Sequence, residues 1–172
     1  MMSCYIWCVQ VIPERARILY FNEKYVEGLK VVVKRYSRRS NYYVNIEANI
    51  KYECNNNVTV HLIFYEFLHN EYKRSFVELH FRLCDLVNKD PYLGKALANA
   101  GLTSCPVPKG KIAIHNITIP TNDFPNVWPF ERCKVDIRFE VTTTNELIAN
   151  YEIYVFFKDR DVILKYSKNS KN

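Results

Sequence analysis

The segment LTSCPVPKG at residues 102–110 leads directly into the alternating segment KIAIHNITIP at residues 111–120, and together they decide the expected fold. Upstream, Cys84 lies in LCDL, where a segment with helical spacing begins. Two cysteines that bracket a short helix, followed by a Cys-Pro-x-x-x-Gly turn into a strand, indicate a disulfide-tied element that caps a β-sheet. The chain is therefore expected to be a secreted β-protein rather than a cytosolic enzyme.

Length and composition indicate one globular domain. The 172 residues are 48% hydrophobic and 15% aromatic, and the 13 Tyr and 10 Phe favour strands and broad contact surfaces. Only four glycines occur, which excludes a Gly-rich phosphate loop. The net charge of +6 would favour anionic surfaces without indicating nucleic acid. No apolar run reaches the ~18 residues that a transmembrane helix needs.

Alternation with period two predicts most of the strands. Residues 42–53 alternate apolar and polar side chains, as in a strand with one wet face. The turn CNNN at residues 54–57 separates this strand from a partner over residues 58–68. Further strands are predicted at residues 31–33, 76–81, 111–119, 134–141 and 147–158. Strands joined largely by hairpins predict an all-β fold, an immunoglobulin-like two-sheet antiparallel sandwich.

Residues 82–100 break this alternation. Apolar residues recur there at spacings near three and four, and Pro91 interrupts them, which predicts two short helical pieces with a kink. The sandwich domain is expected over residues 21–160, followed by a charged tail at residues 161–172. Residues 1–20 are interpreted as a leader or signal-like remnant, although they lack a basic start.

Six cysteines and two sequons favour the secretory pathway. No Cys-x-x-Cys pair occurs and no histidine has zinc-finger spacing, so no metal site is expected. The tripeptides Asn57-Val58-Thr59 and Asn116-Ile117-Thr118 predict glycosylation at Asn57 and Asn116. Together these features predict a secreted glycoprotein with disulfides.

Catalysis and nucleic-acid binding are not expected. His61 and His115 lie on the predicted polar faces of strands, where a surface role is favoured over a catalytic one. The chain has no Gly-x-Ser-x-Gly, His-Glu-x-x-His or Walker motif, and no cofactor is implied. The basic residues 34–39 are interpreted as a solvated turn rather than a nucleic-acid groove.

Three motifs in order carry a family resemblance. Residues 102–114 resemble the Cys-Pro-x-x-x-Gly element of the ganglioside-activator-like branch of the ML lipid-recognition superfamily. The segment FPNVWP at residues 124–129 looks like that family's proline turn. RYSRRS at residues 35–40 is similar to the start of an insect family that includes the CheB chemosensory proteins. The resemblance covers roughly residues 29–158 and implies a secreted β-cup, with two sheets splayed at one end around an apolar cavity.

The family resemblance indicates the expected cysteine pairing only in part. The bridge between Cys84 and Cys105 is the better supported one, and it would stabilise the fold by about 3 kcal/mol in the chain-entropy model. Relatives more often have an acidic residue where Cys54 stands, and a glycine near Cys133, so a second bridge between these two is expected. Connectivity stays open, because several pairings satisfy the sequence.

The resemblance implies a non-enzymatic protein that binds a lipid, fatty acid or hydrocarbon between its sheets, with a role in chemosensation. The expected pocket walls are Ile46, Ile50, Leu62, Phe64, Ile137, Phe139, Tyr151, Ile153 and Val155. The expected rim, from the kinked helical segment and the proline turn, comprises Tyr92, Leu93, Leu97, Phe124, Trp128 and Phe130.

Two alternatives stay open at this stage. The apolar rows would equally fill a solid sandwich core, and the protein would then act through surface loops on a receptor or partner protein. In the other alternative the protein lifts a glycolipid from a membrane and presents it to a hydrolase. That role would involve transient contact with an anionic membrane surface.

Overall fold

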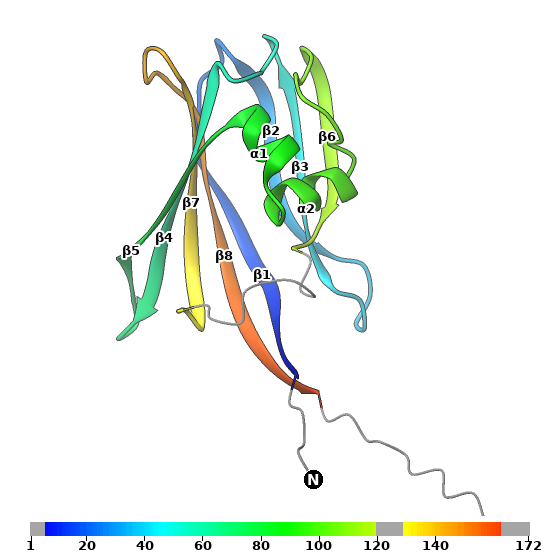
Figure 1. Cartoon of the computed structure of the whole chain (residues 1–172), viewed down its shortest axis with the longest axis vertical. Coiled ribbons are helices and arrows are strands. Elements are labelled where there is room, and N and C mark those ends of the chain that lie inside the picture. Colours follow the sequence, from blue (N-terminus) through cyan, green and yellow to red (C-terminus); the bar gives the residue numbers. More distant parts are fainter. Residues whose placement is uncertain (1–5, 120–128, 163–172) are drawn as a thin grey trace, which may run out of the picture.

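The protein folds into two antiparallel β-sheets that face each other (Figure 1). The computed structural model describes residues 6–119 and 129–162, with side chains placed for residues 9–119 and 129–158. The larger sheet has the strand order β1-β8-β7-β4-β5, and the smaller sheet has the order β2-β3-β6. The predicted all-β, two-sheet sandwich with a helical insertion is confirmed.

The strands of the larger sheet are β1 (Ile6–Phe21), β4 (Val58–Leu68), β5 (Glu71–Arg82), β7 (Arg132–Val141) and β8 (Leu147–Val162). Those of the smaller sheet are β2 (Val26–Arg35), β3 (Tyr42–Ile50) and β6 (Gly110–Ile117). The helices are α1 (Leu83–Lys89) and α2 (Leu93–Asn99).

Period-two alternation places the side chains of β3 and β4 as predicted. Val44 and Ala48 are buried in the interior from β3, and Val60 and Leu62 from β4. Asn45 is an exception on the polar side of β3. It is buried, and its Oδ1 accepts a hydrogen bond of 2.8 Å from the backbone N–H of Asn116 in β6, which offsets the cost of burying a polar group.

The N-terminal strand β1 was not predicted. Residues 6–21 pair antiparallel with β8 from one end to the other, so they are an integral edge of the larger sheet rather than a separate leader. The register shifts between Pro13 and Arg15 and again between Ile18 and Tyr20. Each bulge moves the following side chains to the other face, which hides the alternation in the sequence. The domain therefore includes residues 6–20, and β8 runs into the segment predicted as a charged tail.

The helical insertion covers the side between the two sheets. Figure 1 shows α1 and α2 between the β5 edge of the larger sheet and β6 of the smaller sheet, and α1 contacts β4 and β5 while α2 contacts β6. The predicted break at Pro91 is confirmed. Asp90 Oδ1 accepts hydrogen bonds from the backbone N–H groups of Tyr92 and Leu93, at 3.0 and 2.6 Å, so this carboxylate starts α2.

A disulfide between Cys84 and Cys105 ties this insertion to the sandwich, with a Cα–Cα distance of 5.2 Å, as predicted. Next to it, the backbones of Cys54 and Val107 exchange two hydrogen bonds of 2.8 Å. The segment after α2 is therefore fixed to the turn that precedes β4.

The second predicted bridge, between Cys54 and Cys133, is wrong, and both thiols are free. Cys54 lies before the first residue of β4, whereas Cys133 pairs with Glu66, eight positions after Val58. At ~3.3 Å per residue the two cysteines are separated by more than about 25 Å along the sheet. Burial raises the pKa of the Cys133 thiol to about 12, so this side chain stays protonated as a core residue.

The contact between α1 and α2 depends on a glycine. A Cβ atom at Gly94 would lie 2.5 Å from the backbone oxygen of Leu86 and 3.0 Å from that of Val87.

No helix among the described residues has the length and apolarity to cross a membrane.

We expect Gly94→Ala to destabilise the fold by about 1–2 kcal/mol. Alanine gains about 1 kcal/mol of helix propensity, but overpacking against rigid backbone costs about 1–3 kcal/mol and dominates. Urea denaturation measures the difference, with Lys95→Ala on the exposed face of α2 as the control. A Gly94→Ala protein as stable as Lys95→Ala would show that the helices adjust without cost.

Candidate functional site

Apolar side chains from both sheets meet in one continuous interior. A larger and a smaller cluster of buried residues share partly buried neighbours, among them Ile137, Phe139 and Ile153. All nine predicted wall residues belong to this interior. Leu62, Phe64, Tyr151 and Val155 are buried, whereas Ile46, Ile50, Ile137, Phe139 and Ile153 are partly exposed.

The partly exposed wall residues lie where a filled sandwich would be closed. Ile137 and Ile153 point inward from β7 and β8, which are internal strands of the larger sheet, and Ile46 lies on β3, the middle strand of the smaller one. An inward side chain on an internal strand is normally excluded from water by the opposing sheet. Here solvent reaches all three, so the space between the sheets offers apolar surface for a ligand to cover.

Only some of the residues predicted for the rim lie at the edge of the interior. Leu93 and Leu97 of α2 pack against the larger cluster, and Tyr92 is partly exposed at the start of the helix. Phe130 is a correction, because it is a buried wall residue whose ring stacks on Phe64 at a centroid distance of 6.2 Å. Sequence placed it beside the proline turn, and only the packing of β4 shows that its ring turns inward. Phe124 and Trp128 lie outside the described residues.

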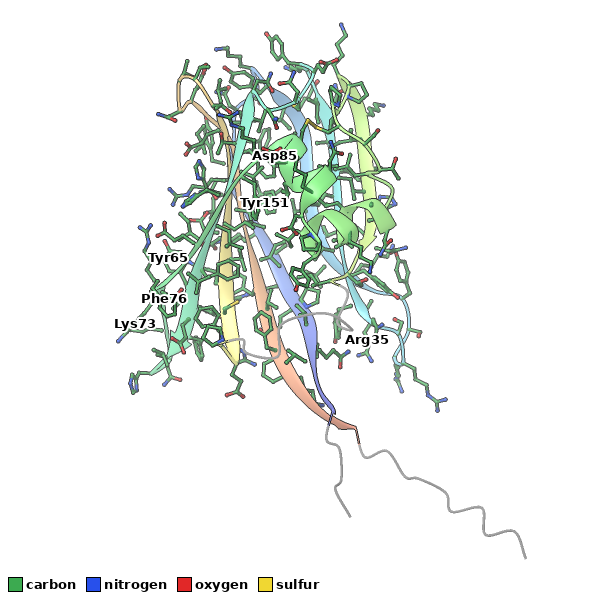
Figure 2. The ribbon with its side chains drawn as sticks, viewed as in Figure 1. Arg35, Tyr65, Lys73, Phe76, Asp85 and Tyr151 are labelled. Carbon is green, nitrogen blue, oxygen red and sulfur yellow. A yellow bond between two sulfur atoms is a disulfide. The ribbon has the colours of Figure 1, made fainter. Side chains whose placement is uncertain are left out.

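Tyr151 brings a polar group into this interior. Its side chain, labelled between the two sheets in Figure 2, is 5% exposed, and its ring lies 5.9 Å from that of Phe139. Burial raises the pKa of the phenol well above its ordinary value, so it stays protonated. Its hydroxyl oxygen has no hydrogen-bond partner among the described residues. It is also not one of the side-chain atoms that are completely buried without a partner. Tyr151 was predicted as a wall residue, but nothing in the sequence indicates that its hydroxyl is free to bind.

Two residues of β1 also line the interior, and neither was predicted from the sequence. Ala16 and Ile18 pack against the smaller cluster, next to Tyr151 and Ile153. The apolar pair Val9 and Val11 was the available signal for this strand, and the bulge after Pro13 interrupted it.

The outer face of the larger sheet carries charge, and part of it is buried. Asp136 and Glu152 are each 4% exposed and lie opposite one another on β7 and β8. Glu152 accepts from Lys134 Nζ at 2.8 Å and from the Tyr154 hydroxyl at 3.0 Å. Burial opposes ionisation of Glu152, but these hydrogen bonds outweigh it and lower the pKa of the carboxyl.

Asp136 is paired on the same face by Arg138, whose Nη2 lies 2.9 Å from its Oδ2. Arg17 lies on the edge strand β1, and its Nη2 is 3.2 Å from Glu152 Oε2. The polar residues of β7 therefore face outward, as predicted, and the long side chains of neighbouring lysine and arginine residues cover Asp136 and Glu152.

The basic hairpin between β2 and β3 is held by its own contacts. Arg35 Nε donates to the Ser40 backbone oxygen at 3.2 Å, and its guanidinium lies 5.0 Å from the centre of the Tyr42 ring. Lys34 Nζ lies 4.9 Å from the centre of the Tyr36 ring. Figure 2 labels Arg35 at this tip. The hairpin is an exposed basic turn with aromatic partners.

The two predicted sequons are exposed. Asn57 lies in the turn before β4, and Asn116 lies on β6 at the edge of the smaller sheet with a positive φ of 61°. The Asn116 side-chain oxygen accepts a hydrogen bond of 2.7 Å from the Tyr36 hydroxyl. Both asparagines are reachable from solvent, as glycosylation would need.

The sequence matches no protein-family model and no curated protein. Among the described residues, no group of three or more His, Cys, Asp or Glu side chains is placed to hold a metal ion. The interior between the sheets, with its partly exposed apolar side chains and a Tyr151 hydroxyl that is unpaired among the described residues, is therefore the candidate functional site.

We expect Glu152→Gln to destabilise the fold by about 2 kcal/mol at pH 7, because Lys134 would lose its charged partner while largely buried. The folded-state pKa of Glu152 is lowered. The stabilisation is therefore fully present above the unfolded value of about 4.3 and is lost as the pH falls through the lowered folded-state pKa. Urea denaturation should show the difference between wild type and variant shrinking as the pH falls below about 4.

Glu23→Gln is the control for this experiment, because Glu23 is exposed. Its stability should follow that of the wild type at both pH values. A constant difference between Glu152→Gln and wild type from pH 7 to pH 3 would contradict the ion-pair explanation.

Proposed function

We propose that this protein is a secreted, non-enzymatic carrier that binds a lipid, fatty acid or hydrocarbon derivative between its two sheets. The observation that carries the proposal is the partial exposure of Ile46, Ile137 and Ile153, inward-facing apolar side chains on internal strands of both sheets. Covering such surface yields roughly 25 cal/mol per Å² before the costs of ordering the ligand.

The disulfide and the sequons support secretion. A bridge such as that between Cys84 and Cys105 persists in oxidising compartments, and both sequon asparagines are exposed. The resemblance to the ML superfamily and its insect chemosensory branch adds the class of ligand and a role in chemosensation to this proposal.

The free phenol of Tyr151 favours a ligand with a polar end. A pure hydrocarbon that sealed the interior would leave this hydroxyl without a partner, at a cost of about 1–3 kcal/mol. A fatty acid, alcohol or ester could accept a hydrogen bond from it. We therefore propose an amphipathic chain with one oxygen function as the ligand class.

A second candidate is a filled sandwich that acts on a protein partner. The observation that favours it is Phe76, which is 88% exposed on β5, the edge strand of the larger sheet, where Figure 2 labels it. An exposed aromatic side chain on an edge strand is suited to a partner surface. A lipid-presenting role beside a hydrolase would instead use the basic hairpin against an anionic membrane.

Ligand uptake tests the proposal directly. Native mass spectrometry of the protein secreted from insect cells, before and after organic extraction, should show near-stoichiometric bound lipid and re-uptake of an added C16 fatty alcohol. Ile46→Glu should reduce uptake at least tenfold, because a charge would face the apolar interior. Val32→Glu is the matched control, since Val32 is an exposed residue of the adjacent strand. A clean mass with no uptake would favour the filled sandwich.

We expect Tyr151→Phe to weaken binding of the fatty alcohol about three- to tenfold, the effect of losing one hydrogen bond. Binding of an alkane of the same length should stay unchanged or improve, because the unpaired hydroxyl is removed. Competition against a fluorescent fatty acid measures both ligands. An equal loss for alcohol and alkane would show that Tyr151 acts through packing alone.

A further inference from the structure

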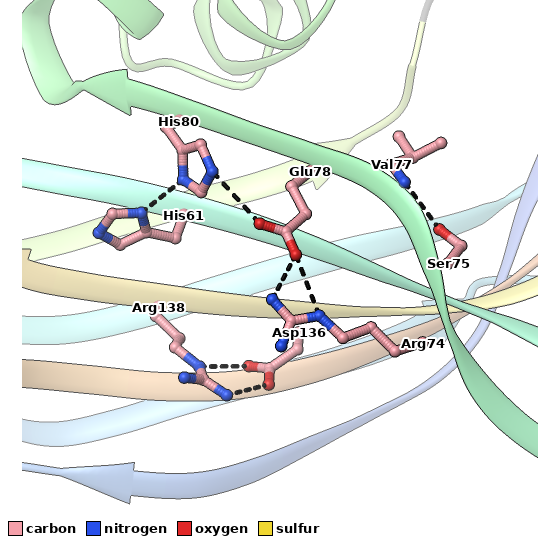
Figure 3. Close-up of polar contacts among 8 residues, drawn as sticks. All are labelled: His61, Arg74, Ser75, Val77, Glu78, His80, Asp136 and Arg138. Atoms are coloured by element: carbon pink, nitrogen blue, oxygen red, sulfur yellow. Dashed lines mark hydrogen bonds and ion pairs between the residues drawn. The ribbon is translucent and has the colours of Figure 1, made fainter.

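Two histidines lie face to face on the outer side of the larger sheet. His61 of β4 and His80 of β5 are directly opposite in the antiparallel register. Their Nδ1 atoms are 2.7 Å apart, and the rings meet edge to face at a centroid distance of 4.9 Å (Figure 3). The pair lies on the face opposite the apolar interior, because Val60 and Leu62 on either side of His61 point inward.

The other nitrogen of each ring faces a carboxylate. His61 Nε2 lies 3.3 Å from Glu140 Oε2, and His80 Nε2 lies 3.5 Å from Glu78 Oε2. Glu78 is itself held by Arg74, whose Nε donates to it at 3.0 Å (Figure 3). A hydrogen on each Nε2, beside its carboxylate, would leave both Nδ1 atoms as acceptors that face each other. A hydrogen on one Nδ1 would instead make their contact an ordinary hydrogen bond.

With both Nδ1 atoms as acceptors, their lone pairs repel at this distance unless a positive ion lies between them. A transition-metal ion can fill that place, because neutral imidazole is one of its preferred ligands. The surrounding carboxylates point to the metal. Metal-binding histidines commonly donate their second N–H to a carboxylate, which fixes the ring, and each Nε2 here lies within 3.5 Å of a carboxylate oxygen.

We propose that His61 and His80 bind a zinc-like divalent transition-metal ion through their Nδ1 atoms, with Glu140 and Glu78 orienting the two rings. Zinc–nitrogen bonds of about 2.0–2.1 Å at tetrahedral angles place two ligand nitrogens about 3.3 Å apart. The rings must therefore separate by a few tenths of an ångström. His80 can move by this amount because its side chain is 51% exposed.

The site uses two protein ligands, so water or a donor from a partner completes the coordination. Such a site is weaker than a closed structural site with four protein ligands. The neighbouring cations do not block it. Arg138 lies opposite His61 on β7, but its guanidinium is bound to Asp136, and Arg74 is bound to Glu78.

Metal binding here would join β5, the edge strand, to β4. It would occupy the outer face of the sheet, whereas the proposed lipid occupies the inner face. The two sites are therefore separable, and a negative result for one leaves the other untouched.

Zinc titration of the full chain tests the proposal. Calorimetry with ZnCl2 should show one equivalent bound, and MgCl2 should show none, because magnesium prefers oxygen ligands. His80→Ala and His61→Gln should each weaken zinc binding at least tenfold, and Glu140→Gln about tenfold as a positioning residue. His115→Ala is the matched control, since His115 pairs with Glu47 at 2.9 Å as a single exposed histidine on β6.

Nitrogen NMR of the imidazoles separates binding at histidine from binding at the free thiols. Zinc should shift the Nδ1 resonances of His61 and His80 and leave those of His115 in place. Thermal unfolding checks that each variant is folded. If His61→Gln does not fold, zinc binding by His80→Ala still tests the proposal, because His80 is exposed. Unshifted Nδ1 resonances, or zinc binding by His80→Ala equal to wild type, would overturn the proposal.

Discussion

The three-stranded sheet is too narrow to cover the five-stranded one, and much of the structure follows from this mismatch. Burial of one apolar face drives the two sheets together, but the smaller sheet approaches the larger one at β1 and β8, whereas β4 and β5 contact α1. Helices α1 and α2 occupy that remaining surface, and Leu83, Leu86 and Ala96 supply the apolar contacts. The disulfide between Cys84 and Cys105 joins α1 to the segment after α2 and so holds both helices against the sandwich.

The same mismatch explains why the interior is unevenly closed. Val60, beside the helices, is 1% exposed, whereas Ile137 and Ile153 on the neighbouring strands remain partly exposed. Helices pack against a sheet with their own side chains and fill the space near β4. In the two-sheet part, Ile137 and Ile153 stay partly exposed on internal strands, and this is the part where a ligand is proposed.

Sequence periodicity predicted β4 to the residue, both helices and the break at Pro91, because each is a local pattern. It failed for β1, whose two bulges shift the phase of the alternation, and a phase shift is invisible without the partner strand β8. The pairing of Cys54 with Cys133 failed for the related reason that cysteine distance depends on register. For the site, the wall residues were predictable as inward positions. The burial of Phe130 and the free hydroxyl of Tyr151 required the packing of several strands at once.

Strand β4 connects the two candidate sites without coupling them. Its even-numbered residues, including Leu62 and Phe64, enter the interior, and its odd-numbered residues, including His61, face outward. Because alternate side chains leave a strand on opposite sides, a change of ligand inside reaches the outer face only by moving the β4 backbone. Hydrogen-bonded neighbours on both sides, β7 and β5, resist that movement. The exposed edge of β5 is less restrained, so an ion bound between His61 and His80 would act mainly on the position of this edge strand.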